Sequence, residues 1–246
     1  MPKPGQSKKE RVFPKTEDEN QRQPRTLKER FMDFYYDAIP YFTLNLAWFV
    51  MSLPVVTIFP ALGGLYGGVM ELNQEGRADW NSVWEGFKKY WWLSLRWGLL
   101  VLTGDVILAV NIWFYLNIDQ NWALIALMLA IVFSIFWIAI HQFSFPLLLM
   151  QDEKKIFLAI RNGYVVVMRQ PLATLKVMLL GLVISVVSTL LPPLWIFVSM
   201  ALIVQLRIRT VLKAVKRIKE KDADRDVVKA HHQGDHNNQE KTEDYD

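Results

Sequence analysis

The most prominent feature of the chain is three long stretches without a charged side chain. Residues 38–70, 120–151 and 177–206 contain no Asp, Glu, Lys or Arg, which gives uncharged runs of 33, 32 and 30 residues. A helix of about 20 apolar residues crosses the hydrocarbon core of a bilayer. The pattern therefore predicts an all-α protein, a polytopic bundle of transmembrane helices.

Run length and helix-breaking residues divide the apolar part of the chain into about six predicted membrane segments. They are Pro40–Phe59, Pro60–Leu72, Trp91–Leu116, Trp122–Met150, Leu172–Leu191 and Leu194–Leu212. The second segment has only 13 residues, and a helix of that length rises about 20 Å against a hydrocarbon core of about 30 Å. Two possibilities stay open for residues 60–72: a short crossing, or a re-entrant hairpin formed with the first segment.

The basic residues predict how these segments are oriented. All 28 Lys and Arg residues fall in the N-terminal flank, in residues 73–96, in residues 151–176, or in the last segment and the tail after it. The predicted loops at 117–121 and 191–193 contain none. Because Lys and Arg concentrate on the cytoplasmic side of a membrane, we expect a multi-pass protein with both termini in the cytoplasm.

The two ends of the chain are highly charged and differ from the apolar middle. We expect residues 1–24 to form a disordered N-terminal tail, residues 25–215 the transmembrane domain, and residues 216–246 a disordered C-terminal tail. The second tail contains three histidines, which could bind a transition metal; they are His231, His232 and His236. They lack helical periodicity and apolar support, so we expect disorder there and predict no metal site.

The segment Arg77–Trp91 has the pattern of an amphipathic helix lying on the membrane surface. Its large apolar residues recur at helical spacing on one face; they include Trp80, Trp84, Phe87 and Trp91. Asp79 or Ser82 is placed to cap its start. Similar stretches precede the first segment and follow the fourth and the last. They serve either to anchor the bundle at the inner surface or to dock a cytoplasmic partner.

Four glycines in the short second segment form two overlapping pairs of small residues at a spacing of four. They are Gly63, Gly64, Gly67 and Gly68. Such pairs let helix backbones approach closely within a membrane. We expect them to pack against a neighbouring helix of the same chain, with a homodimer face as the alternative.

A small set of polar residues lies inside the predicted membrane segments. Asp105 falls near the middle of the third segment, where an ionised carboxylate is costly unless it is paired or protonated. Counted from the inner ends of their segments, Asp105 and His141 lie at similar depths, close enough to bond directly or through water. Asn111, Gln142 and Asn45 are placed to complete a polar pocket. The group is either a proton relay or a hydrogen-bonded contact that fixes helix register.

Several classes of function lack their sequence motifs. The chain has no cysteine, which excludes disulfides, thiolate metal sites and cysteine nucleophiles. We find no GxxxxGK[ST], HExxH, GxSxG or GxGxxG motif, so we expect no enzyme activity and no cofactor. The net charge of +4 comes from residues that flank apolar segments, so we expect lipid headgroups of the bilayer as partners and no nucleic acid.

Three stretches together resemble a known family. They are Leu53–Leu62 (LPVVTIFPAL), Trp84–Trp91 (WEGFKKYW) and Phe145–Leu149 (FPLLL). The chain resembles the YesL-type family of bacterial integral membrane proteins over roughly residues 25–215. The resemblance implies a protein of the bacterial cytoplasmic membrane, from a family often encoded beside carbohydrate ABC importers. The family's activity is undefined, so the resemblance transfers no site residues.

Two functions are compatible with these features. The first is a non-enzymatic accessory or regulatory component of a membrane assembly such as a carbohydrate ABC importer, which the amphipathic stretches favour. The second is a small-solute or proton-coupled transporter that uses Asp105 and His141.

Overall fold

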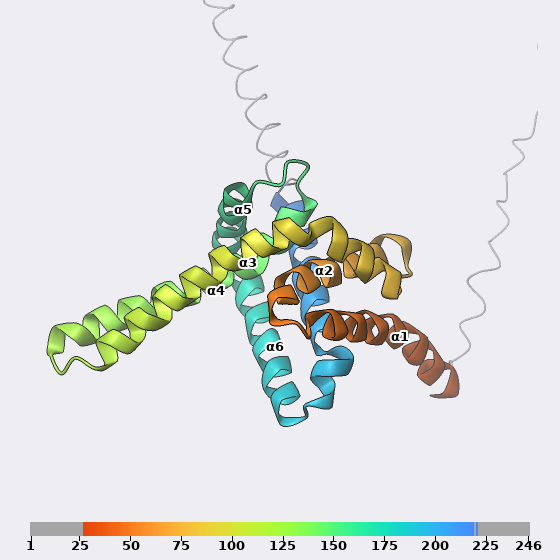
Figure 1. Cartoon of the computed structure of the whole chain (residues 1–246), viewed down its shortest axis with the longest axis horizontal. Helices are drawn as coiled ribbons and strands as arrows, with labels where there is room; N and C mark the ends of the chain where they lie inside the picture. The colour runs from red at the N-terminus through yellow and green to blue at the C-terminus, as the bar shows by residue number, and fades with distance from the viewer. Residues whose placement is uncertain (1–26, 219, 221–246) are drawn as a thin grey trace, which may run out of the picture. The chain divides into compact units, whose positions relative to one another are not determined.

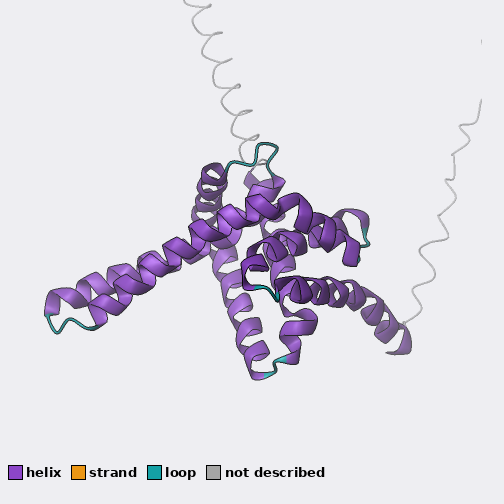
Figure 2. Ribbon diagram, viewed as in Figure 1, coloured by secondary structure: helices purple, strands orange, loops and turns teal. Residues whose placement is uncertain are grey.

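The computed structural model describes residues 27–218 and residue 220, and these residues form helices joined by short loops, without a strand (Figure 2). In chain order the elements are α1 (Leu27–Ser52), the 3₁₀-helix η2 (Val55–Thr57), α2 (Ile58–Glu75), α3 (Trp80–Leu116), α4 (Asn121–Met150), α5 (Ile156–Arg169), α6 (Pro171–Leu190) and the π-helical turn η3 (Trp195–Ser199). The last helix opens with η3 and runs over Trp195–Ile218. The predicted all-helical fold class is confirmed.

The chain divides into two compact units, Met1–Ala38 and Ile39–Asp246. The boundary falls within α1, and the contacts described below all lie in the second unit. The predicted tail at residues 1–24 lies outside the described residues, as do residues 221–246 with His231, His232 and His236. The last helix continues to Ile218, past the boundary predicted at residue 215.

Within the described residues, five helices are long and apolar enough to cross a membrane. They are Val55–Glu75, Trp80–Leu116, Asn121–Met150, Pro171–Leu190 and Trp195–Ile218. A sixth apolar helix, Ala38–Ser52, is shorter. The six predicted segments therefore each have a helical counterpart, but the short one is the first and not the second.

The first predicted segment, Pro40–Phe59, is interrupted. α1 ends at Ser52, and α2 begins at Ile58 after the turn of η2. Pro54 explains the break, because proline lacks a backbone N–H and disfavours helical geometry in the residue before it. The Thr57 hydroxyl closes the turn by donating to the carbonyls of Met51 and Pro54, both at 2.6 Å.

The segment Arg77–Trp91 does not form a separate helix as predicted, because from Trp80 onward it is the first part of one 37-residue helix, α3. The predicted cap at Asp79 is confirmed: its carboxylate accepts from the Ser82 backbone N–H, and the Ser82 hydroxyl accepts from the Asp79 N–H. No proline follows to stop the helix. A helix of this length rises about 55 Å, nearly twice the thickness of a hydrocarbon core.

α3 packs against different partners along its length. Its first half lies against α2, which runs antiparallel to it, so that Gly68 faces Val83 and Phe59 faces Gly98. Its second half forms an antiparallel hairpin with α4 (Figure 1). A buried cluster joins the first half to α1, α4 and the last helix; its members include Leu44, Leu65, Tyr66, Val83, Phe145, Leu148 and Ile208.

Candidate functional site

Asp105 lies in the hairpin of α3 and α4 and bonds to a residue that the sequence analysis did not single out. The indole N–H of Trp137 on α4 donates to Asp105 Oδ1 at 2.9 Å. Gly104 makes room for the Trp137 ring, since a Cβ at this position would lie 2.6 Å from it. An indole donor stabilises a carboxylate that has little access to water. The Asp105 carboxylate is thus part of a contact between the two helices.

His141 lies one helical turn after Trp137. The sequence analysis expected it to bond to Asp105, but the two side chains form no direct hydrogen bond. Its imidazole packs edge-on against the Trp97 and Trp137 rings, with centroid distances of 6.3 and 6.1 Å. Its Nδ1 atom is buried without a hydrogen-bond partner in the described part of the chain. Trp137 therefore contacts both predicted site residues and lies where a direct bond between them was expected.

Two of the three other residues expected in this pocket, Asn111 and Gln142, do not join it. Asn111 donates its amide to the carbonyl of Ile107 at 2.8 Å, one turn earlier on α3 itself. Gln142 is half-buried on α4, one residue after His141 and so turned about 100° from it around the helix. A polar pocket around Asp105 that includes Asn111 is therefore not formed.

Asn45 was expected in the same pocket but lies in a different contact. Its amide nitrogen donates to the carbonyls of Trp195 and Ile196, at 2.7 and 2.8 Å, and its oxygen accepts from the backbone N–H of Ala201 at 2.8 Å. A π-helical turn such as η3 shifts the backbone hydrogen-bond pattern and leaves groups to be satisfied from outside. The fully buried Asn45 side chain supplies those partners and joins α1 to the last helix.

All four glycines of the second predicted segment lie on α2 where it meets its neighbours in the chain. A Cβ at Gly64 would lie 2.6 Å from the Val83 carbonyl, and one at Gly67 would lie 3.1 Å from the Gly86 Cα. A Cβ at Gly68 would meet the Leu44 side chain at 2.8 Å, and one at Gly63 would overlap Ser94. Close backbone contact between α2 and α3 depends on these positions.

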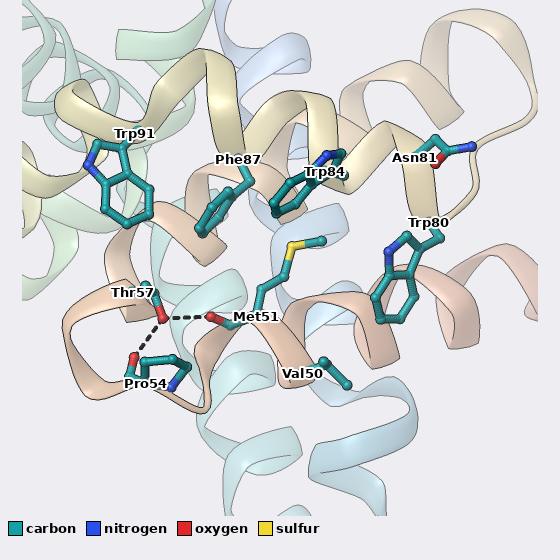
Figure 3. A pocket seen from close by; sticks show the side chains of 9 residues that line it. All are labelled: Val50, Met51, Pro54, Thr57, Trp80, Asn81, Trp84, Phe87 and Trp91. Atoms are coloured by element: carbon teal, nitrogen blue, oxygen red, sulfur yellow. Dashed lines mark hydrogen bonds between the residues drawn. The ribbon is translucent and has the colours of Figure 1, made fainter.

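The aromatic residues predicted for a surface helix form one wall of a groove instead (Figure 3). Trp80, Trp84, Phe87 and Trp91 come from α3, and the opposite wall comes from the end of α1 and the turn after it. That wall consists of Val50, Met51, Pro54 and Thr57, and Asn81 completes the lining. The groove has a volume of about 710 Å³ and is mainly apolar.

Ring packing fixes the aromatic wall of the groove. Trp84 and Phe87 stack with centroids 5.4 Å apart, and Phe87 meets Trp91 edge to face at 4.9 Å. The Lys88 ammonium lies 5.5 Å from the centre of the Trp84 ring, within the range of a cation–π contact. The groove therefore has an apolar wall of packed aromatic rings, with the Lys88 ammonium beside it.

Metal binding has no support among the described residues, where no three His, Asp or Glu side chains come together in a way that could hold an ion.

Comparison with known proteins gives one match. The model of the family described as "Protein of unknown function, DUF624" matches residues 41–112. No curated protein and no solved structure matches the chain. The matched segment carries every residue that lines the groove, together with Asp105 and the four glycines. The match is consistent with the YesL-type resemblance and does not itself name that family.

The sequence analysis missed two components of these sites. Trp137 carried a signal, since it lies four residues before His141 on the same face of the helix. The wall formed by Val50, Met51, Pro54 and Thr57 carried none, because only the tertiary packing of the α1–α2 turn brings it beside α3.

Proposed function

We propose that the chain is a non-enzymatic integral membrane protein that acts as an accessory or regulatory component of a larger membrane assembly. In this proposal it lies in a bacterial cytoplasmic membrane with both termini in the cytoplasm. The resemblance to the YesL-type family suggests a carbohydrate ABC importer as the assembly.

The hydrogen bond between Trp137 and Asp105 carries this proposal. A carboxylate that moves protons or ions must exchange partners, whereas Asp105 is committed to an indole whose ring fits against Gly104. Asn45 and Asn111 likewise use their amides on backbone carbonyls. Asp105 and Asn45 join neighbouring helices, and Asn111 bonds within its own helix. This use of the polar groups favours a scaffold over a transport pathway.

The outer part of the α3–α4 hairpin offers a surface for such an assembly. It exposes large apolar side chains along both helices, among them Leu99, Val106, Val110, Trp113, Met128, Leu129, Val132 and Ile135. Lipid or the apolar helix of another membrane protein satisfies such a surface equally well. A neighbouring subunit can therefore bind there without any rearrangement of the hairpin.

Co-purification from native membranes tests the proposal. We expect a stoichiometric membrane partner, and we expect Leu129→Trp on α4 to reduce its recovery because the larger ring obstructs the hairpin surface. Leu182→Trp on α6 is the matched control, since the two leucines are exposed to similar extents, 67% and 60%. Recovery of the protein without any stoichiometric partner contradicts the proposal.

Transport of a small solute or of protons is the second candidate, and His141 favours it. Its Nδ1 atom is buried and unpartnered, and Trp137 links it to Asp105. Asp105→Asn keeps an oxygen that can accept from Trp137 but cannot titrate. If the chain alone in liposomes supports flux and folded Asp105→Asn does not, the transporter function replaces the accessory one.

A further inference from the structure

The groove between α3 and the α1–α2 turn keeps apolar surface exposed on a rigid part of the molecule. Trp80 and Trp84 are 39% and 44% exposed, and Val50 on the facing wall is 42% exposed. Figure 3 shows the rings of Trp91, Phe87 and Trp84 in a row along α3, opposite Met51 and Pro54. An elongated apolar groove of this kind requires an occupant or a cover.

The size of the groove decides between two kinds of occupant. A helix of ten residues, about 15 Å long and 10 Å across, fills about 1,200 Å³. The groove holds about 710 Å³, within the range of small-ligand pockets, which is about 300–1,000 Å³. A flexible hydrocarbon chain therefore fits better than a helix from a partner.

The polar groups around the groove indicate what the hydrocarbon chain is attached to. The indole N–H groups of Trp80, Trp84 and Trp91 make no hydrogen bond within the described residues, so three residues of the lining carry a donor without an acceptor. Lys88 lies beside Trp84 and forms no ion pair with any described residue. Donors and an unpaired ammonium suit ester carbonyls and a phosphate.

The neighbouring charges on α3 differ in their placement. Glu85 follows Trp84 by one residue and points about 100° away from it around the helix. Lys89 lies over the Tyr90 ring, 5.2 Å from its centre, and Tyr90 packs on α2. Lys89 also lies near Lys154, where burial and then the charge of Lys89 lower the pKa of the Lys154 ammonium. Lys88 is thus the basic residue of this turn that borders the groove.

The groove is continuous with the apolar surface of α3. Leu102 and Val106 follow Trp84 and Trp91 within about 60° of them around α3, and they are 48% and 52% exposed. A hydrocarbon chain can therefore pass along one face of α3 from the hairpin surface into the groove. The groove opens to the bilayer as an extension of a lipid-facing helix.

We propose that the groove binds one acyl chain of an anionic phospholipid, with Lys88 pairing with the headgroup phosphate. The aromatic wall of Trp84, Phe87 and Trp91 packs along the chain, and indole N–H groups donate to the ester region. This is a bound lipid site of defined composition, separate from the contact of Asp105 with Trp137.

Native mass spectrometry of the full chain tests the site. The protein is incorporated into nanodiscs containing equal amounts of phosphatidylglycerol and phosphatidylcholine, extracted in mild detergent, and the retained lipids are counted. We expect one retained phosphatidylglycerol per chain, and loss of it in Trp84→Ala. Lys88→Gln should reduce the preference for phosphatidylglycerol about fivefold, and Lys89→Gln, the matched control, should leave it unchanged.

A second variant guards against misfolding of Trp84→Ala. Val50→Trp fills the groove from the opposite wall without removing an aromatic contact, and it should also lose the retained lipid. Equal retention of both lipids, equal effects of Lys88→Gln and Lys89→Gln, or a polypeptide bound in place of lipid would overturn the proposal.

Discussion

Asn45 on α1 accepts a hydrogen bond of 2.8 Å from the backbone N–H of Ala201 in the last helix, two residues after the π-helical turn ends. The same side chain donates to two carbonyls at the start of that turn. One amide therefore satisfies three backbone groups across the irregular turn. The packing of these two helices therefore depends on Asn45.

Replacing Asn45 should destabilise the protein more than replacing another asparagine in an apolar helix. Asn45→Leu leaves three backbone groups without their side-chain partner, and each unsatisfied buried group costs about 1–3 kcal/mol. We expect a total loss of at least about 3 kcal/mol, read as a lower midpoint of thermal unfolding in detergent. Asn111→Leu, whose amide bonds only within its own helix, should change stability by about 0.5 kcal/mol or less.

The contact between Trp137 and Asp105 should contribute to stability as a hydrogen bond. Trp137→Phe removes the indole donor and should destabilise the protein by about 1–2 kcal/mol, since it leaves the carboxylate without that partner. Asp105→Asn retains an acceptor and should stay within about 0.5 kcal/mol of the original stability.

A double-mutant cycle isolates this contact. We expect Trp137→Phe and Asp105→Leu to couple by about 0.5–2 kcal/mol in thermal unfolding measurements. Additive effects of the two substitutions would show that the hydrogen bond contributes nothing to stability.

The glycines of α2 should be intolerant of a methyl group. Gly64→Ala places a Cβ 2.6 Å from the Val83 carbonyl, so the backbones of α2 and α3 must separate, at about 1–3 kcal/mol. Gly181→Ala on α6 is the control, because a Cβ there meets nothing within 4 Å. It should stabilise by about 0.5–1 kcal/mol, the helix preference of alanine over glycine. Similar unfolding midpoints for the two variants would refute the packing role.

The proposed orientation can be tested with single cysteines, because the chain has none of its own. Cysteines at Gln120 and Pro193 should react with a membrane-impermeant maleimide in intact cells, and those at Gln74 and Asp152 should not. Gln74 lies in the last turn of α2; Gly76, which follows that helix, is unsuitable for this test because its φ of 73° would strain a cysteine. External labelling at Gln74 would overturn the predicted arrangement of the first two helices.

The fold class and the Asp79 cap were predictable from the sequence, because apolar run length and capping chemistry are local properties. The predicted Asp105–His141 contact was wrong because depth was counted from the inner ends of the predicted segments. α3 begins at Trp80, 11 residues before the predicted inner end at Trp91. Counting from the closed loop at Asn117–Gln120 places Asp105 about 18 Å along its helix, Trp137 about 25 Å and His141 about 31 Å. Trp137 is the nearer in level, and its long ring covers the remaining difference.

One wall of the groove could be predicted from the sequence, and the other could not. The spacing of Trp80, Trp84, Phe87 and Trp91 identified an apolar face, but a face of this kind reads the same whether it meets lipid or another part of the chain. What faces it depends on the turn at Pro54, and the position of that turn follows from tertiary packing of α1 and α2.

α3 presents Gly98 to Phe59 and Gly104 to Trp137, and the spacing of six positions from one glycine to the other fixes the angle between the two contacts around the helix. Each inserted or deleted residue turns everything beyond it by about 100° and shifts it by about 1.5 Å. A single insertion between Gly98 and Gly104 would therefore swing Asp105 away from Trp137 while leaving composition and hydropathy almost unchanged. We therefore expect homologous chains to differ in length in the loops at 117–120 and 151–155, and to keep the same length between Gly98 and Gly104.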